Sequence, residues 1–431
     1  MSCNWPIVKL GDYCSKIGSG ATPKGGNSVY LDHGEISLIR SQNIYNEGFK
    51  SDGLVYITPE AAQKLKNVII EPNDVLINIT GDSVARVCLA PNEFLPARVN
   101  QHVAILRVDP EEFDHRYLRY FLTSTKMQNY LLTIASTGGT RNALTKSMLE
   151  SLEVSKPSLD VQKRIGDVLE SFESKIELNS RTNQTLEEMA QAIFKSWFVD
   201  FDPVKAKMNG EQPEGMDAAT ASLFPDKLVE SELGSIPEGW SASSMGEHFN
   251  ITMGQSPKGE TYNEEGEGIA FFQGRRDFGF RYPDVRVYTT DPKRFAKAGD
   301  TLISVRAPVG DKNMAAIDCC IGRGVAAIKH KSDSRSFTYA FMSHIEKKLG
   351  DSGSSGTVFS SINQKELKKV SFVAPPQELI EAFHKIVDPI DQKVEVLSKE
   401  IESLSSLRDT LLPKLLSGEI ELDVERVNAN D

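Results

Sequence analysis

Residues 157–198 carry seam positions at alternating steps of four and three residues. Eight of these ten positions are apolar and two are Asn, in the order Ile165, Leu169, Phe172, Ile176, Asn179, Asn183, Leu186, Ala190, Ile193 and Trp197. This spacing is the heptad pattern of a coiled-coil helix. It predicts one long helix over residues 157–204. Asp160 is the expected cap, and about 39 residues at 1.5 Å rise would span roughly 58 Å.

The same pattern returns 218 residues later. Nine positions are apolar and one is Arg, in the order Phe383, Val387, Ile390, Val394, Leu397, Ile401, Leu404, Arg408, Leu411 and Leu415. A second long helix is therefore expected over residues 376–418, and Pro389 should kink it or mark a new start. Two matching helices, each preceded by a segment of similar length, indicate a tandem duplication.

The segments before the helices contain short β-rich runs between Gly, Pro, Asn and Asp turns, such as 36–40, 75–80 and 102–108, and a helical run at 117–132. Four stretches recur in the same order. Residues 17–26, 71–79, 100–107 and the loop, helix, strand and proline near 136–157 correspond to 251–260, 297–305, 322–329 and 354–376. The predicted fold is mixed α/β (α+β), with two tandem-repeat globular domains at 1–156 and 237–375. An irregular connector at 205–236 and a tail at 419–431 complete the chain.

Composition and cysteine usage exclude several classes of protein. The chain has 431 residues, 39% apolar and 25% charged, and five cysteines without a C-x-x-C pair. Neither a disulfide framework nor a cysteine zinc site is expected. No stretch approaches the roughly 18 apolar residues that cross a bilayer, so a cytoplasmic location is expected.

The net charge of -11 is unevenly distributed. Residues 1–156 carry 16 basic and 16 acidic side chains, and residues 237–374 carry 19 and 16. The acidity lies in the helices and linkers, so the globular segments remain compatible with phosphate contact. A neutral module alone would bind DNA weakly, because affinity comes largely from counterion release by Lys and Arg.

Catalytic and cofactor motifs are weak. Residues 322–327 match G-x-G-x-x-A formally, but the corresponding NQHVAI of the first copy has no glycine, so a turn into a strand is the better interpretation. The loop at 17–26 lacks P-loop spacing, and the seven histidines lack metal-ligand spacing. Asp200 and Asp202 fit a capping role better than a catalytic pair. No catalytic residues and no metal site are predicted.

Polar loop residues remain as candidates for DNA binding. Arg can contact guanine through N7 and O6, and Asn or Gln can contact adenine through N6 and N7. The candidates in the first copy are Lys24, Arg40, Gln42, Asn43, Arg86, Arg98, Gln101, Thr140, Arg141 and Asn142. Those in the second copy are Lys258, Gln273, Arg275, Arg276, Arg306, Arg323, Thr357, Ser360 and Asn363. For any single residue, a solvated loop side chain is the simpler interpretation.

The repeat architecture, with PSLDVQKRI at 157–165, IPEGW at 236–240 and LLPKLLSGEI at 411–420, resembles the specificity subunit of type I restriction-modification systems over nearly the whole chain. The resemblance implies two target recognition domains that each read half of a bipartite double-stranded DNA sequence, separated by two long antiparallel helices with pseudo-twofold symmetry. It also implies two methyltransferase subunits per chain and restriction subunits as partners. S-adenosylmethionine, ATP and Mg would act in those partners, with no cofactor in this chain.

The two helix starts differ from each other. Gln162 and Arg164 have no counterpart in the second copy, so the two starts are not expected to contact methyltransferase subunits identically. Asn179 and Asn183 are expected to help select the antiparallel arrangement, because buried Asn in an apolar seam fixes alignment. Two other interpretations stay open: a DNA-binding protein without enzyme partners, and a coiled-coil scaffold that recognises protein.

Overall fold

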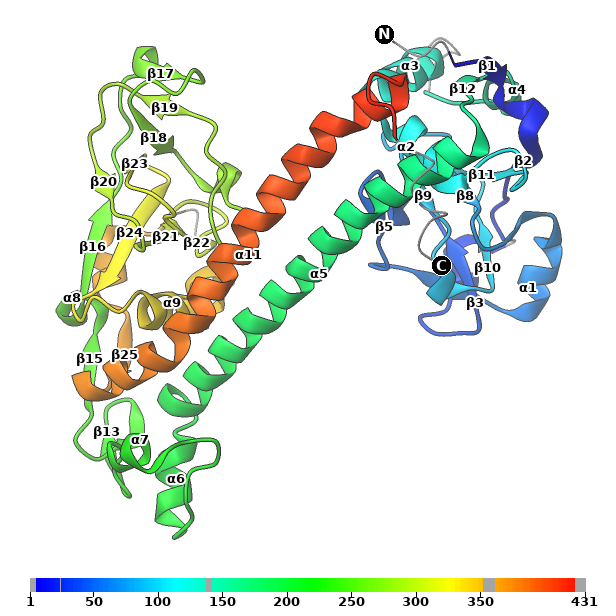
Figure 1. Cartoon of the computed structure of the whole chain (residues 1–431). Coiled ribbons are helices and arrows are strands. Elements are labelled where there is room, and N and C mark those ends of the chain that lie inside the picture. Colours follow the sequence, from blue (N-terminus) through cyan, green and yellow to red (C-terminus); the bar gives the residue numbers. More distant parts are fainter. Residues whose placement is uncertain (1–4, 24, 137–141, 352–360, 423–431) are drawn as a thin grey trace, which may run out of the picture. The chain divides into compact units, whose positions relative to one another are not determined.

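The structure is a computed structural model, and it describes residues 5–23, 25–136, 142–351 and 361–422 (Figure 1). Contacts divide the chain into two compact units. Unit 1 comprises Met1–Glu177 and Glu402–Asp431, and unit 2 comprises Leu178–Ile401. The two longest helices, α5 (Leu159–Phe198) and α11 (Gln377–Ser417), each contribute residues to both units.

Unit 1 is built on two four-stranded sheets. The first has the order β2 (Cys14–Ser19), β11 (Val103–Val108), β8 (Val75–Asn78) and β9 (Val87–Leu89), all antiparallel. The second has the order β6 (Val55–Ile57), β3 (Ile36–Ile39), β10 (Ala97–Val99) and β7 (Ile69–Ile70). Its β3 and β10 are parallel, and its other pairs are antiparallel.

The first sheet of unit 1 is buried on both faces. Leu76 and Ile105 pack toward the second sheet with Ile39 and Val99. Ile77, the neighbour of Leu76 on β8, belongs instead to the cluster that the sheet forms with the helices. Because successive side chains of a strand point to opposite faces, a strand covered on both sides must be apolar throughout, which explains the continuous run Val75-Leu76-Ile77.

Helices cover the outer face of this sheet. The cluster that they form with it includes residues of α2 (His115–Thr123), α3 (Thr125–Ser136), α4 (Lys146–Glu150) and the first turns of α5. Asp114 caps α2 by accepting hydrogen bonds from the backbone N–H groups of Arg116 and Tyr117. The remaining elements of unit 1 are small: β1 (Ile7–Lys9) paired with β12 (Glu153–Ser155), β4 (Ile44–Tyr45) paired with β5 (Gly48–Phe49), and α1 (Pro59–Lys64).

Unit 2 repeats both sheets with the same connectivity. The first sheet has the order β16 (Phe249–Met253), β24 (Val325–His330), β21 (Thr301–Ser304) and β22 (Lys312–Met314). The second has the order β17 (Tyr262–Asn263), β19 (Tyr288–Thr289), β18 (Ile269–Phe272), β23 (Cys319–Ile321) and β20 (Phe295–Ala296). Here β18 and β23 form the parallel pair. The predicted tandem duplication and mixed α/β fold are confirmed.

The helices and edge strands of unit 2 also follow the first copy. α9 (Arg335–Asp351) packs against the first sheet, as α2 and α3 do in unit 1. α8 (Met245–His248), α10 (Gln364–Lys368) and the pair β15 (Ser241–Ser244) with β25 (Ser371–Ala374) complete it. Gly322 and Arg323 lie in a turn that leads into β24, as expected from the sequence.

The segment between the first long helix and the second globular region is not irregular, contrary to the prediction. It contains α6 (Asp202–Met208), α7 (Ala218–Ser222) and a hairpin of β13 (Leu228–Ser231) and β14 (Gly234–Pro237). Val204, Phe224 and Trp240 are buried in the core cluster of unit 2. These few apolar anchors order a stretch whose Pro, Gly and acidic composition predicts a loop.

The predicted seam residues line the facing sides of α5 and α11. All twenty heptad positions are buried or half-buried. In unit 2 the Trp197 and Phe383 ring centroids are 6.0 Å apart, and the Asn183 side-chain amide donates to Ser398 Oγ at 3.2 Å. In unit 1, Ile165 and Leu169 share a cluster with Leu415. Within each unit the two helix segments therefore run antiparallel.

Several details of the helices differ from expectation. Asp160 is the second residue of α5 and lies in its first turn, so it is not the cap. α11 continues through Pro389 without a break. The Gln162 side chain is fully buried and donates to the backbone oxygens of Pro157 and Glu112, so it serves the fold of unit 1. No helix in the described ranges is long and apolar enough to cross a membrane.

Candidate nucleic-acid interface

The predicted DNA-binding loops of unit 1 meet at one edge of its two sheets. Strand register places the end of β2 beside the start of β11 (Ser19 and Ala104) and the end of β8 beside the same strand (Asn78 and Val103). In the second sheet, β3 and β10 end together, because Ile39 pairs with Val99. Loops that leave these strand ends carry the candidate residues. The topology therefore gathers segments far apart in sequence.

In the loop that follows β3, the candidate side chains bind their own loop. Arg40 Nη2 and Gln42 Nε2 donate to the Gly53 carbonyl at 2.6 Å and 3.2 Å, and the Arg40 guanidinium lies 5.3 Å from the Tyr30 ring centroid. Asn43 is completely buried, and its amide donates to two backbone oxygens of the same loop. The burial of Asn43 corrects its assignment as a base-reading residue.

Two further arginines of unit 1 are held by intramolecular contacts. The Arg86 guanidinium stacks 4.7 Å from the Tyr45 ring centroid, and Lys50 approaches the same ring at 4.3 Å. Arg98 is 9% exposed and donates to the carbonyls of Ala62 and Ala97. Burial lowers the pKa of Arg98, because the charged guanidinium has lost solvent. Arg98 is thus a structural residue, which corrects the prediction.

The exposed amides of unit 1 lie between β10 and β11 and after α3. Gln101 accepts a hydrogen bond from the Thr22 hydroxyl, and its Nε2 lies 2.9 Å from His102 Nε2. Asn142 is exposed, and its carbonyl accepts from the Gly81 N–H at 3.4 Å. Lys24, Thr140 and Arg141 fall outside the described residues.

Unit 2 presents the same edge with different side chains. Register pairs Met253 of β16 with Ala326, Ser304 of β21 with Val325, and the parallel ends Phe272 and Ile321. The candidate loops follow β16, β18, β21 and β23. They carry Lys258, Gln273, Arg275, Arg276, Arg306 and Arg323, and all six side chains are exposed.

Five of these six residues line one cavity. The cavity measures about 440 Å³, and its lining includes these five residues, the additional Arg286 and one acidic residue, Asp277. Arg286 was not predicted. It forms an ion pair with Asp277. The only feature of the sequence that could have indicated it is the presence of four arginines between positions 275 and 286.

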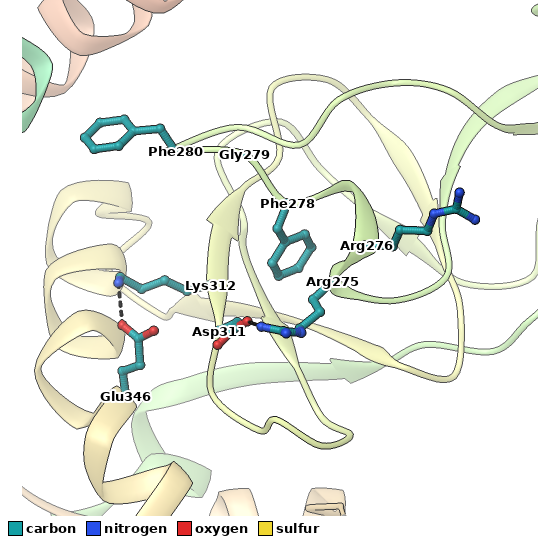
Figure 2. A pocket seen from close by; sticks show the side chains of 8 residues that line it. All are labelled: Arg275, Arg276, Phe278, Gly279, Phe280, Asp311, Lys312 and Glu346. Carbon is teal, nitrogen blue, oxygen red and sulfur yellow. Dashed lines mark hydrogen bonds and ion pairs between the residues drawn. The ribbon is translucent and has the colours of Figure 1, made fainter. Parts of the chain in front are cut away.

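Some of the positively charged side chains around this edge have acidic partners and others do not (Figure 2). Arg275 points toward Asp311 and pairs with it, and Lys312 pairs with Glu346 at 2.6 Å. These pairs line a neighbouring cavity of about 500 Å³, from which the Arg276 side chain points away. Arg276, Arg306 and Arg323 have no side-chain hydrogen bond or ion pair with any described residue. The 440 Å³ cavity therefore carries excess positive charge, which suits a polyanion.

The remaining residues predicted to bind DNA in unit 2 have other roles or are not among the described residues. Asn363 caps α10, accepting from the N–H groups of Lys365 and Glu366, just as Thr145 caps α4 in unit 1. Lys258 is exposed and 3.8 Å from Glu260. Thr357 and Ser360 are not among the described residues.

The described residues hold no group of three or more His, Cys, Asp or Glu placed to bind a metal ion. Burial raises the pKa of the Cys88 and Cys319 thiols to about 12, so both stay protonated. Burial also lowers the pKa of His330 to about 4, with the nearby His248 acting in the same direction. The arrangement at the edge provides hydrogen-bond donors for recognition.

Comparison with known proteins gives a consistent result. A family model described as "Type I restriction modification DNA specificity domain" matches residues 3–188 and 237–406, one match for each copy. A putative type I restriction enzyme MjaX specificity subunit from Methanocaldococcus jannaschii is 29% identical, over 97% of this chain and 94% of its own. The type I restriction enzyme HindI specificity subunit from Haemophilus influenzae is also 29% identical, over 97% of this chain and 100% of its own.

Among solved structures, the S subunit of a type I restriction-modification system from M. genitalium has a TM-score of 0.61 at 19% identity. The alignment covers 96% of both chains. The likeness extends to the fold of nearly the whole chain.

Proposed function

The chain belongs to the family of type I restriction-modification DNA specificity subunits, which are non-catalytic components, and we propose that each of its units reads one half of a bipartite DNA target. The observation that carries this proposal is the duplicated edge. Two copies of one sheet pair end in polar loops at equivalent places, and the loop side chains differ between the copies. A shared scaffold with different loops is what two different half-sites require.

In this proposal α5 and α11 set the distance between the half-sites. Helices of 40 and 41 residues have fixed lengths at about 1.5 Å per residue, so they act as a ruler along the DNA. The seam positions named above, from Ile165 to Leu186 and Ile193 in α5 and from Ile390 to Leu411 in α11, keep the ruler in register. The outer faces of the helices dock the methyltransferase subunits, two per chain, and restriction subunits join that complex.

The ruler is tested by lengthening both helices. One heptad is inserted between Glu177 and Leu178 and one between Ile401 and Glu402, where the two units divide. Each insertion adds about 10.5 Å, or about three base pairs, so methylome mapping of the complex should show unchanged half-sites around a longer spacer. Insertion into α5 alone is the control, because it breaks the seam. An unchanged spacer after the double insertion would refute the ruler.

Independent reading is tested by exchange of residues 1–156 for those of another specificity subunit. Only one half-site should change in the methylome. A change in both half-sites would show that the units do not read separately. Co-purification with methyltransferase subunits distinguishes a working specificity subunit from a DNA-binding protein without enzyme partners.

A further inference from the structure

Resting on the proposed function, we infer that Arg306 and Arg323 are the residues of unit 2 that read guanine in the major groove. The inference begins with convergence. Arg306 follows β21 and Arg323 lies between β23 and β24, yet both line the 440 Å³ cavity together with Gln273, which follows β18. Three separate strand ends thus supply one recognition surface.

The backbone holds these three residues together. Gly324 N–H donates to the Gln273 carbonyl at 3.0 Å, and the Gly324 carbonyl accepts from the Val305 N–H at 3.0 Å, next to Arg306. On the other side of the turn, Gly322 N–H donates to Phe272 at 2.8 Å and Arg323 N–H donates to Ser256 Oγ at 3.2 Å. The two arginines therefore project from backbone that is fixed on both sides.

Glycine at position 324 is required for this arrangement. A Cβ atom there would lie 2.6 Å from the Gln273 carbonyl oxygen, and one at Gly322 would lie 2.9 Å from Gln273 Cα. Both contacts are shorter than real Cβ atoms make, so a side chain would push the loops apart. The close approach of these loops thus depends on the Gly322-Arg323-Gly324 sequence, which gives it a purpose other than nucleotide binding.

Arg275 and Arg286 of this cavity have acidic partners, whereas Arg276, Arg306 and Arg323 have none among the described residues. The backbone hydrogen bonds between the loops described above hold Arg306 and Arg323 but not Arg276. Asp311 neutralises Arg275, and Asp277 neutralises Arg286. Arg306 and Arg323 have no acidic partner among the described residues, so their planar donor forks are available. A guanidinium can donate two parallel hydrogen bonds to guanine N7 and O6, which is the commonest specific arginine contact with DNA. The fixed backbone favours this contact over a phosphate contact, which needs charge but no defined geometry.

The test uses the complex with methyltransferase subunits and a target defined by methylome mapping. The half-site of unit 2 is the one that changes when residues 237–375 are exchanged. Each guanine in it is then replaced by 7-deazaguanine, which lacks only the N7 acceptor. Affinity should fall roughly 5- to 150-fold at one or two positions, as expected when a bidentate contact with a charged donor loses one of its two hydrogen bonds. Inosine, which lacks only the minor-groove amine, should have no effect there.

The variants assign the contact to residues. In the R306Q or the R323Q variant, replacing guanine by 7-deazaguanine should no longer lower the affinity at one of the sensitive positions. R323K keeps the charge but lacks the planar fork, so it should lose the same sensitivity while the salt dependence is retained. K258Q is the control for a phosphate contact, with uniformly weaker binding and a salt slope smaller by about one.

The inference is overturned if 7-deazaguanine binds as well as guanine throughout this half-site, or if R306Q and R323Q weaken binding uniformly, as K258Q does. Neither result would contradict the proposal of bipartite reading, because methylome mapping of the target tests that proposal separately. A complex without any bipartite methylation pattern would instead contradict the proposed function.

Discussion

Units 1 and 2 share a framework but use arginine differently at the edge proposed to bind DNA. In unit 1, Arg40 binds a carbonyl, Arg86 stacks on Tyr45, and Arg98 is buried. In unit 2, Arg306 and Arg323 line a cavity and have no side-chain partner among the described residues. The two units share the arrangement of their sheets because both faces of a sheet must pack against other elements. The loop side chains have no such packing constraint, so they can differ between the units. The edge can therefore change its specificity without a change in the core.

The ion pairs made by the long helices are also partly shared and partly different between the two units. Glu170 of α5 pairs with Arg116, and Asp388, 218 residues later, pairs with Arg335 at the equivalent start of α9. At the next carboxylate position the partners diverge. Glu173 binds Arg119 of α2, whereas Asp391 binds Arg281, which lies in the segment between β18 and β19.

The largest effect is expected from R281M. The Arg281 side chain is 2% exposed, contacts Glu187 and Asp391, and lies 3.5 Å from the Tyr339 ring centroid. Its removal leaves the buried Asp391 with only the Ser336 hydroxyl as a partner among the described residues and leaves the half-buried Glu187 without its ion pair. The free energy of unfolding of unit 2 should therefore fall by about 3–5 kcal/mol. R119M should cost less, because Glu173 is 30% exposed.

Urea unfolding followed by hydrogen exchange measures the two units separately. R275M is the matched control, since the Arg275–Asp311 pair is exposed and should contribute about 0–1 kcal/mol. Equal losses for R281M and R275M would contradict a structural role for the buried network.

Glycines at the equivalent edges of both units should be equally sensitive. A Cβ at Gly20 would lie 1.7 Å from the Val99 oxygen, and one at Gly254 would lie 2.1 Å from the Gly322 oxygen. G20A and G254A should each lower the free energy of unfolding by at least about 1–3 kcal/mol. G18A is the control, because a Cβ there meets nothing within 4 Å. A neutral G254A would contradict the close packing of these loops.

The polar seam positions offer a comparison between the two helices. Asn179 and Asn183 occupy places that Leu397 and Ile401 hold in the second helix, and both asparagines are 2% exposed. Replacing both with Leu should stabilise unit 2 by about 1–3 kcal/mol, since Asn179 Nδ2 has no hydrogen-bond partner within the part of the chain that the structure describes.

We propose that the stabilised protein loses specificity of alignment, seen as altered half-site spacing or assembly with methyltransferase subunits. Methylome mapping and mass measurement of the complex report both. Unchanged spacing and assembly would show that the asparagines do not select the antiparallel arrangement.

The smallest effect concerns pH. Burial lowers the pKa of His330 to about 4 from 6.5. As the pH falls below 6.5 the unfolded chain takes up this proton first, so unit 2 should lose stability progressively down to about pH 4. Val108 occupies the equivalent end of β11 in unit 1. H330V should therefore remove part of the acid sensitivity of unit 2 and leave that of unit 1 unchanged, as measured by urea unfolding at pH 7 and pH 5. An unaltered pH profile would exclude His330 as the cause.

Periodic features were predictable from the sequence. The heptad spacing identified both long helices, and the repeated islands identified β8 with β21 and β11 with β24. The ordered connector was missed, because a few anchors such as Val204 and Phe224 outweigh its loop-like composition. Arg286 was missed because its place in the cavity with Gln273 depends on the pairing of β18 with β19 across an irregular segment.

The sequence by itself determined the duplication, the helix seam and the set of polar loops, because apolar periodicity and repeated order are properties of the chain alone. Only the tertiary structure decided which polar side chains are available. Asn43 and Arg98 turned inward to satisfy backbone carbonyls, whereas Arg306 and Arg323 have no carboxylate partner among the residues that the structure describes. That division depends on which backbone oxygens and carboxylates come within reach of each side chain after folding.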